Sequence, residues 1–534
     1  MIVPNSSDLY YAEVIRAIED AGIEVDFIAG TSMGALVGGL YASGLTAAEL
    51  ERIITEVDWA DAFADRIPRA DRSFRRKRDD DLYLVKNKPG VAGAKLKFPL
   101  GILDGQKIDL LLKRHTLRVA HVRDFDELSI PFRAVAADLA SGDAVVIGRG
   151  DLARAMRASM SIPVVFAPRE LDGRLLTDGG ISVNLPIDVV RGMGANVVIA
   201  VDISSPLLER EALESVLAVA DQLTGIMTRR NTEEQIASLA EEDVFICPDL
   251  GAITTASFGR AAEAIPAGVK AAEEALGELA RLSVPVEEYD AYAARRARPG
   301  PAPVIDEVRI VNESRLSDAV IAERIGAETG SPLDVDRLER DIAQVFGLEL
   351  FESIYYDVAD ESDRTTLTVA ARERSWGPNY AQFGVAVFED FEGPNFNLAA
   401  AYARTAVNRL NAEWRTGVQI GQEPQAYSEF YQPLDHSLHP FVYLKASIGE
   451  QTEGVFDTDG NNLSELGVRR GGVGDGPAVG LGVLVRVAVG ANVVVDVGSG
   501  VLVGALVSVG SIIAGRSFVD VAGTCVTVGV NVGG

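Results

Sequence analysis

The chain has little of the residues on which several kinds of functional site depend. Its 534 residues include only two cysteines, Cys247 and Cys525, and four histidines. Two cysteines provide no disulfide framework, and neither residue type has the spacing of a metal-binding motif. The sequence also lacks a phosphate-cradling loop. It therefore predicts no metal and no cofactor.

Positive charge is scarce as well. Lysine and arginine total 50 against 78 aspartate and glutamate residues, a net charge of −28. This balance argues against general binding to nucleic acid or to anionic bilayers. Segment 66–78 is a local exception, with two interpretations: a solvated face paired with Asp79, Asp80 and Asp81, which we favour, or a contact for lipid phosphates. Its cations include Arg69, Arg72, Arg75, Arg76 and Lys77.

The first ten residues lack the features of an export signal. Residues 1–10 have neither a basic start nor an apolar core, so they do not form a signal peptide. Either the true start lies upstream or the chain stays in the cytoplasm.

A Gly-x-Ser-x-Gly motif is the most informative feature that is present. The motif reads Gly30-Thr31-Ser32-Met33-Gly34. It follows the apolar segment 25–29 and precedes a helix-like segment, which is the setting of a nucleophile elbow. Small neighbours allow the sharp turn, and the helix N-terminus favours developing negative charge. Because a chain with 52 glycines can contain this pattern by chance, the flanking segments carry the interpretation.

A serine nucleophile needs a base, and two kinds of candidate are present. A Ser-His-Asp triad is the less favoured choice, because none of the histidines is flanked by small or turn-forming residues. They are His115, His121, His436 and His439. Asp178, which ends an apolar run before Gly179 and Gly180, is the better candidate, since burial would raise its pKa. Taken alone, Asp178 is better explained by an Asp-Gly turn between two strands than by a catalytic role.

Several separated blocks, in the same order and spacing, resemble the patatin-like phospholipases over roughly the first three hundred residues. The blocks are 29–35 with Gly38, Gly39, Tyr41 and Gly44, then 132–139, 157–163, 177–180 and 184–186. The resemblance implies that Ser32 is the nucleophile and Asp178 the base of a Ser-Asp dyad. That dyad would attack the ester carbonyl of a lipid through an acyl-enzyme.

One departure from the family concerns the oxyanion hole. Family members carry a glycine-rich loop ahead of the first helix, whose backbone N–H groups bind the oxyanion. Residues 1–10 contain no glycine, and family-like sequence resumes near Tyr11. Loss of one oxyanion donor costs about a hundredfold to a thousandfold in rate. The oxyanion donors are therefore not identified, although Asn5 and Ser6, common turn residues, could still donate N–H groups.

The pattern of residues 1–298 predicts an α/β lobe. Short apolar runs such as 132–136 and 197–201 alternate with helical periodicities, as in a largely parallel sheet covered by helices. Residues 207–282 are expected to be mostly helical. A stiff proline-rich linker follows at 295–303.

Residues 303–375 predict a small α+β domain. Strand-like segments at 304–312, 353–358 and 365–371 flank helix-like segments at 317–325 and 334–346. This order resembles the POTRA domain, a periplasmic module of outer-membrane barrel proteins. Many small domains share the same order, so the specificity of this resemblance is moderate.

Residues 377–460 suit an outer-membrane β-barrel. Apolar and polar positions alternate with aromatic residues at the segment ends, as in 380–388 and 396–402. Four or five such strands are visible, too few to close a barrel, so the barrel is expected to be incomplete.

Residues 467–534 form a glycine- and valine-rich tail of doubtful origin. The tail contains no lysine, and Phe518 is its one aromatic residue. A shifted reading frame would explain this composition and the atypical first ten residues. A membrane span within 497–515 and a barrel lined by small residues are less favoured alternatives.

Two functional hypotheses follow, and they differ in class. The first is a lipid acyl hydrolase of the phospholipase A or lysophospholipase type, acting on a phospholipid or another acyl ester. The second is a catalytically impaired remnant that serves only as a membrane-associated binding or assembly module. The resemblance places the protein at the outer membrane and admits a homodimer.

Overall fold

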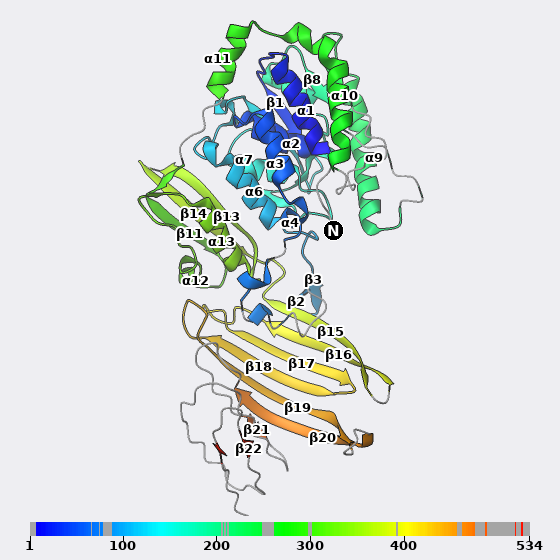
Figure 1. Cartoon of the computed structure of the whole chain (residues 1–534), viewed down its shortest axis with the longest axis vertical. Helices are drawn as coiled ribbons and strands as arrows, with labels where there is room; N and C mark the ends of the chain where they lie inside the picture. The colour runs from blue at the N-terminus through cyan, green and yellow to red at the C-terminus, as the bar shows by residue number, and fades with distance from the viewer. Residues whose placement is uncertain are drawn as a thin grey trace, which may run out of the picture. The chain divides into compact units, whose positions relative to one another are not determined.

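The chain folds into two compact units, seen in the computed structural model of Figure 1. The first comprises residues 1–73, 98–314 and 324–375, and the second comprises 74–97, 315–323 and 376–534. The structure describes residues 7–65, 67–73, 75–77, 79, 88–203, 207, 210, 213–247, 261–296, 302–361, 363–390, 393–456, 462–475, 486–488, 518–519 and 525–526.

The first unit is built on a five-stranded mixed sheet. Its strands are β1 (Ile28–Thr31), β4 (Phe132–Asp138), β5 (Ala144–Ile147), β6 (Arg169–Leu171) and β7 (Arg174–Asp178). The order is β1-β4-β7-β6, with β5 also on β4, and only the β1–β4 pair is parallel. The expectation of a largely parallel sheet is therefore wrong. Short loops join β4 to β5 and β6 to β7, and such loops permit only antiparallel pairs.

Strand β1 begins later than the apolar run 25–29 suggests. The backbone N–H of Val25 donates to the Tyr292 hydroxyl at 3.2 Å, and that hydroxyl donates to the Val25 carbonyl at 3.3 Å. The backbone N–H and carbonyl of Val25 are thus both hydrogen-bonded to the Tyr292 side chain. Sheet pairing starts at Ile28, which lies opposite Phe132.

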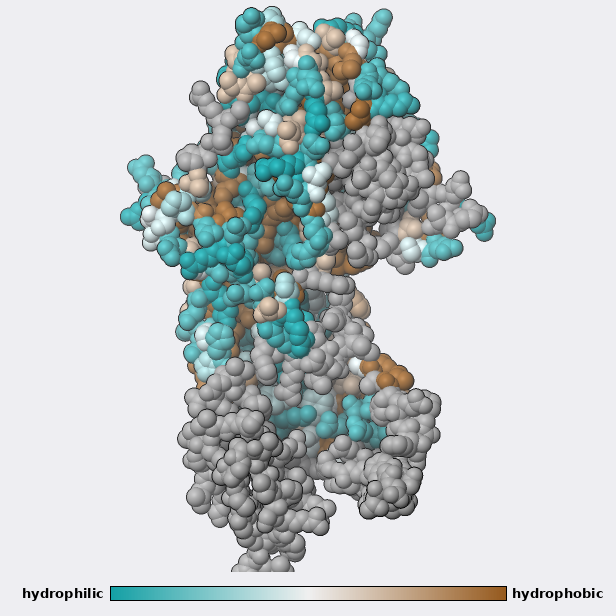
Figure 2. Space-filling view, viewed as in Figure 1, coloured by the Kyte–Doolittle hydropathy of each residue, from teal (hydrophilic) through white to brown (hydrophobic). Residues whose placement is uncertain are grey.

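Helices pack against this sheet and supply most of the core. They are α1 (Ser7–Asp20), α2 (Met33–Ala42), α3 (Ala47–Glu56), α4 (Trp59–Ala62), α6 (Gln106–Thr116), α7 (Leu152–Ser159) and α8 (Ile187–Met193). Buried Leu36, Leu40 and Met156 meet Phe132 of β4 in one apolar cluster. Such burial contributes about 25 cal/mol per Å² of apolar surface. Hydrophilic side chains predominate on the face of this unit that Figure 2 shows.

A parallel pair, β8 (Ile199–Val201) and β9 (Val244–Ile246), continues the lobe. Helices α9 (Val216–Ile236), α10 (Ala261–Leu279) and α11 (Val286–Arg296) follow in the segment expected to be mostly helical and just after it. Ile246 and Leu279 share an apolar cluster with Tyr10 and Val14 of α1.

Residues 304–375 contain the three strands and two helices that the sequence suggests, and two further strands of two residues each. These are β10 (Val304–Ile305), β11 (Glu307–Glu313), α12 (Asp318–Ala322), β12 (Ser331–Pro332), α13 (Val335–Phe346), β13 (Phe351–Glu361) and β14 (Arg364–Glu373), with sheet order β11-β14-β13. Most of this segment belongs to the first unit. The Gln106 side chain accepts from the Ile354 N–H at 2.7 Å and donates to the Ile354 carbonyl at 2.5 Å. The identity of the segment as a POTRA domain remains a prediction.

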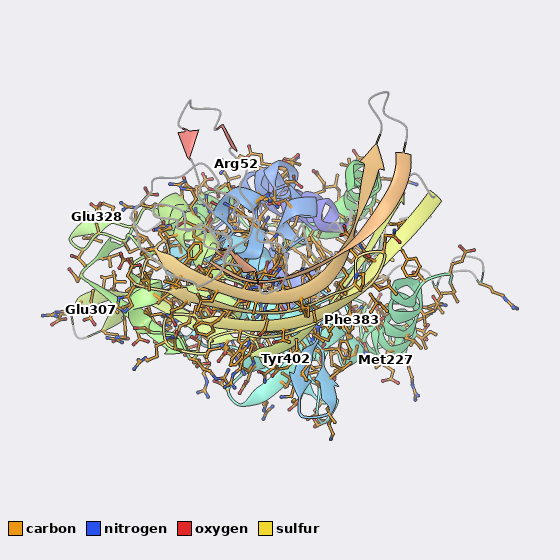
Figure 3. All side chains as sticks on the ribbon, turned by 90° about the horizontal axis from the view of Figure 1, so that it is seen from below. Arg52, Met227, Glu307, Glu328, Phe383 and Tyr402 are labelled. Atoms are coloured by element: carbon orange, nitrogen blue, oxygen red, sulfur yellow. The ribbon has the colours of Figure 1, made fainter. Side chains whose placement is uncertain are left out.

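The second unit contains a nine-stranded antiparallel sheet in the order β21-β20-β19-β18-β17-β16-β15-β2-β3. The strands are β2 (Gly90–Ala92), β3 (Lys95–Lys97), β15 (Asn379–Asp390), β16 (Gly393–Arg404), β17 (Glu413–Gly421), β18 (Gln425–Pro433), β19 (Phe441–Phe456), β20 (Asn462–Asp475) and β21 (Arg486–Ala488). Figure 3 shows its curvature. Within the described strands, no pairing joins β21 to β3, so the barrel is not closed there.

The two faces of this sheet differ in polarity. One face exposes apolar side chains from successive strands: Phe383, Val385, Leu398, Tyr402, Trp414, Ile420, Leu444 and Ile448. Phe383 and Tyr402 are labelled in Figure 3. The other face buries polar groups: Gln382, Asn397, Glu413, Arg415 and Glu429. Successive strand residues point to opposite faces, so this alternation separates the two sets.

The solvated-face interpretation of the basic segment is wrong for two of its arginines. Arg75 and Arg76 are buried, with 4% and 3% of their surface exposed. Arg75 donates through Nε to Glu413 at 3.1 Å, and Arg76 donates through Nη2 to the same carboxylate at 2.5 Å. Arg415 donates to Asp79 at 2.6 Å. Because these cations are paired with buried carboxylates, the lipid-phosphate interpretation is also wrong for them.

The predicted tail is described only in part. Strand β20 pairs with β19 and runs across the predicted boundary near 460–467. The candidate span within 497–515 lies outside the described residues, as do residues 1–6. Among the described helices, none has the length and apolar character needed to cross a bilayer.

Candidate active site

Ser32 lies on a sharp turn between a strand and a helix. Strand β1 ends at Thr31 and helix α2 begins at Met33. Ser32 has φ 53° and ψ −119°, a conformation that costs a non-glycine residue about 1–3 kcal/mol. The turn is held because the Ser32 N–H donates to the Ser159 hydroxyl at 2.9 Å, while its carbonyl accepts from the Ala35 N–H at 3.0 Å.

Close backbone approach requires a glycine at this turn and another at the turn after Asp178. A Cβ on Gly30 would lie 2.3 Å from the Gly34 carbonyl oxygen. A Cβ on Gly179 would lie 2.2 Å from the carbonyl oxygen of Val135 in strand β4. A side chain at Gly30 would therefore force the elbow apart, and one at Gly179 would push its turn away from β4.

The Ser32 hydroxyl donates a hydrogen bond to Oδ2 of Asp178 at 2.5 Å. Sheet register explains how residues 146 positions apart meet. Thr31, just before the serine, pairs with Val135, while Asp178 pairs with the adjacent residue Ala136. Strand β4 thus holds both side chains at neighbouring positions.

The environment of Asp178 suits a base. Only 4% of the residue is exposed. Burial raises the pKa of Asp178 to about 6, although hydrogen bonds from Ser32 and from the Gly180 N–H lower it in part. A carboxylate with this pKa is ionised at neutral pH and is a stronger base than an exposed aspartate.

The Gly179–Gly180 turn is not a hairpin. Strand β7 ends at Asp178 and passes into a 3₁₀ turn, Gly179–Ile181, instead of a second strand. The Gly180 N–H donates to Asp178 Oδ1 at 2.8 Å. Helix α9 supports the turn, because Asn231 donates to the Ser182 carbonyl at 2.9 Å. An Asp-Gly hairpin between two strands is thus excluded.

Three further residues hold Ser32 and Asp178 in position, and no role for them could be predicted from the sequence. Ser159, fully buried, donates to the Val135 carbonyl at 2.5 Å while accepting from Ser32. The Ser161 carbonyl accepts from the Asp178 N–H at 2.9 Å. Buried Arg157 donates to the Ser161 hydroxyl at 2.7 Å. All three residues belong to the block 157–163, whose resemblance to the family was the one sign in the sequence that they matter.

Histidine has no part in these contacts. The described residues include all four histidines, and none of these histidines hydrogen-bonds to Ser32 or Asp178. Burial lowers the pKa of His115 to about 4, with nearby arginines adding to the effect. The triad is therefore not formed in this structure.

No oxyanion donor is predicted from the sequence, and Asn5 and Ser6, which could donate N–H groups if the turn were kept, lie outside the described residues. Helix α2 begins directly after Ser32, so its first N–H groups and the positive end of its dipole favour an oxyanion near the nucleophile. Over the described part of the chain, no group of three or more histidine, cysteine, aspartate or glutamate residues could hold a metal ion.

Residues 9–191 match the sequence model of the family "Patatin-like phospholipase". An uncharacterized NTE family protein of Mycobacterium tuberculosis is 37% identical over 191 residues, covering 36% of this chain and 44% of that protein. The human patatin-like phospholipase domain-containing protein 6 is 31% identical over 198 residues, covering 36% of this chain and 12% of that protein. The chain thus spans less than half the length of these relatives.

Solved structures give weaker matches. VipD from Legionella pneumophila matches with a TM-score of 0.27 and 13% identity, covering 51% of this chain and 65% of that one. BamA from Haemophilus ducreyi lacking POTRA domains 1–3 matches with a TM-score of 0.27 and 8% identity, covering 33% and 32%. Scores this low do not establish a shared fold.

Proposed function

We propose, from the premise that residues 9–191 form a patatin-like phospholipase domain, that the protein hydrolyses acyl esters of lipids. The 2.5 Å hydrogen bond from the Ser32 hydroxyl to buried Asp178 carries this proposal. Ser32 is the nucleophile and Asp178 the general base of a Ser-Asp dyad. The elbow residues Gly30, Thr31, Met33 and Gly34 and the turn residues Gly179 and Gly180 position the two groups.

The reaction proceeds in two steps. In the first step, Asp178 accepts the Ser32 proton as Oγ attacks the ester carbonyl, and the α2 N-terminus stabilises the oxyanion. The C–O bond to the alcohol then breaks, and Asp178 returns its proton to the leaving oxygen. In the second step, Asp178 takes a proton from water as the water oxygen attacks the acyl carbonyl. The bond from the carbonyl carbon to Ser32 Oγ then breaks, Asp178 returns the proton to Oγ, and the fatty acid leaves.

A fluorophosphonate probe tests this proposal on the full chain. We expect labelling that disappears in Ser32→Ala and falls in Asp178→Asn. Ser43→Ala is the matched control, since its buried hydroxyl donates to the Leu40 carbonyl and lies outside the dyad. If folded wild-type protein is not labelled, or if Ser32→Ala is labelled equally, the hydrolase proposal fails. The binding or assembly module would then be favoured.

We also propose that the second unit is part of a lipid-facing barrel at the outer membrane, preceded by a POTRA-like segment at 303–375. The opposed polarity of its sheet supports this assignment. Apolar side chains such as Val385 and Ile448 are exposed on one face, while charges such as Glu413 are buried on the other. That arrangement is typical of membrane barrels. A water-soluble label should fail to react with the exposed face when the protein is in vesicles, and should react with it in urea. That result would support the assignment.

A further inference from the structure

We propose that helix α9 and a neighbouring apolar segment form a surface that docks the active site onto a lipid aggregate. The inference rests on the proposed hydrolase function and extends it, because it names the surface through which a lipid substrate would be presented.

One face of α9 is an exposed apolar stripe. It consists of Val219, Leu223, Ile226 and Met227, exposed by 45%, 56%, 50% and 51%. Residues at this spacing lie on one side of a helix. Met227 is labelled beside α9 in Figure 3. Four large apolar side chains on one stripe are more than the scattered exposure that a water-facing surface usually shows.

The opposite face of α9 is polar and turned toward the site, through Thr228 and Thr232. The Thr228 methyl group lies 3.1 Å from the position that a Cβ on Gly180 would take. Asn231, four residues after Met227, lies at the edge between the two faces. It accepts from the Asn184 N–H at 3.0 Å and donates to the Ser182 carbonyl at 2.9 Å. The buried Thr232 hydroxyl accepts from the Asn184 side chain at 3.1 Å. A helix on a water-soluble domain normally buries its apolar face, so α9 has the inverse arrangement. An apolar outer face is typical of a helix that lies at a lipid interface.

A second exposed apolar segment adjoins the other side of the catalytic aspartate. Phe98, Leu100, Ile102 and Val164 are exposed by 64%, 64%, 52% and 43%. The Ile102 N–H donates to the Val164 carbonyl at 3.0 Å, which joins the segment to the loop after Ser161. The Ser161 carbonyl in turn accepts from the Asp178 N–H. Asp178 is thus connected to the apolar stripe of α9 through the turn that follows it, and to the apolar segment near Ile102 through Ser161.

Charge favours a neutral lipid surface as the occupant. The cations that follow the stripe, Arg229 and Arg230, form i,i+4 ion pairs with Glu233 and Glu234 at 3.1 and 3.5 Å. The end of the stripe therefore has no excess positive charge for anionic headgroups, and apolar contact would dominate. We expect docking on zwitterionic phosphatidylcholine vesicles with little dependence on salt.

An environment-sensitive fluorophore tests docking without requiring turnover. In a full-length Cys247→Ser/Cys525→Ser background, Ile226→Cys and Val286→Cys would each be labelled with nitrobenzoxadiazole. Val286 is the control, because it is 71% exposed on a different helix, α11. Phosphatidylcholine vesicles should shift the emission at position 226 to the blue and leave position 286 unchanged. No shift at 226, or a shift that follows protein concentration and not vesicles, would overturn the proposal and favour a protein partner or a second copy.

A kinetic comparison separates failure of docking from failure of the hydrolase. Leu223→Gln/Ile226→Gln should lower the ratio of the rate on phosphatidylcholine vesicles to the rate on monomeric p-nitrophenyl butyrate about tenfold, since two apolar contacts are lost. Val286→Gln should keep the wild-type ratio. An unchanged ratio in the double variant would refute docking while the hydrolase stands. Absence of Ser32-dependent turnover on both substrates would refute the hydrolase, and the fluorophore would still decide docking.

Discussion

The hydroxyl of Ser159 accepts the backbone N–H of Ser32 at 2.9 Å and donates to the Val135 carbonyl at 2.5 Å. One fully buried side chain thus connects the nucleophile's backbone to the central strand. Because Ser32 has a positive φ, its conformation needs such fixed contacts to persist. Ser159 is a positioning residue in this arrangement and does not touch the reacting atoms.

Replacing Ser159 by alanine should therefore reduce activity more than a comparable loss elsewhere. An unsatisfied buried N–H costs about 1–3 kcal/mol of stability, and a misplaced nucleophile can lower the rate by up to about a hundredfold. Steady-state kinetics and thermal unfolding should be measured together. Ser43→Ala, which also loses a buried hydroxyl hydrogen bond, should lose stability and keep its kcat. Equal kcat in both variants would show that Ser159 has no positioning role.

Activity should depend on the ionisation of Asp178. Burial raises its pKa to about 6, and the base must be unprotonated to accept the serine proton. We expect kcat/KM to rise about tenfold per pH unit below that value and to level off above it. His115→Gln and His121→Gln should keep the same profile. A midpoint near 4, or one that disappears in a histidine variant, would contradict the assignment of Asp178 as the base.

The same pKa shift predicts an unusual stability profile. The folded carboxyl has a pKa of about 6 against an unfolded value of 3.8, so the folded state binds more protons between these values. Stability should fall as pH rises through this window, by about 3 kcal/mol in total. Asp178→Asn removes this loss, so its advantage over wild type should grow between pH 4 and pH 8 in thermal unfolding. A constant difference across that range would refute the shift.

Gly30→Ala tests the close approach in the elbow. The new Cβ would lie 2.3 Å from the Gly34 carbonyl oxygen, a distance that requires the backbone to move. We expect labelling by a fluorophosphonate to be lost while much of the lobe remains folded by circular dichroism. Gly192→Ala in α8 is the control, because nothing lies within 4 Å of its added Cβ. Normal labelling of Gly30→Ala would show that the turn tolerates a side chain.

The candidate site could be predicted because its motifs are local in sequence, whereas the long-range pairing of strands could not be predicted. Ser32 and Asp178 could be named because the residues that shape each turn are neighbours in sequence. The sheet's strand directions were predicted wrongly, because apolar runs look alike in parallel and antiparallel pairs. The strands β2 and β3 are three residues each, too short to leave a pattern. Ser159 lies in the family-like block 157–163, but only the structure shows that it hydrogen-bonds to Ser32.

The basic segment shows the same limit for charges. Runs of arginine usually mark solvated surface, and Arg75 and Glu413 are separated by 338 positions. No sequence pattern links them, because both residues reach the same place only after the sheet has formed. The identity of a buried pair therefore depends on tertiary structure, whereas the expectation of exposure came from composition.

Glu413→Ala should destabilise the second unit strongly. Burial alone would raise the pKa of Glu413, but Arg76, Arg75 and Arg415 together lower it to about 2. Breaking a buried ion pair costs about 3–5 kcal/mol, since the partner charges remain buried. Urea unfolding followed through Trp376 and Trp414, both in the second unit, would measure the loss.

Asp435→Ala is the matched control, because Asp435 is an exposed carboxylate of the same unit that accepts from the Ser437 N–H at 3.0 Å, and its loss should cost less than about 1 kcal/mol. The pKa of Glu413 is lowered from 4.5, so its stabilising contribution is complete above that pH and should be lost as pH falls toward 2. Wild type should lose this contribution on acidification, and Glu413→Ala should not. If both variants unfold alike at neutral pH, buried Glu413 contributes no more to stability than an exposed carboxylate of the same unit.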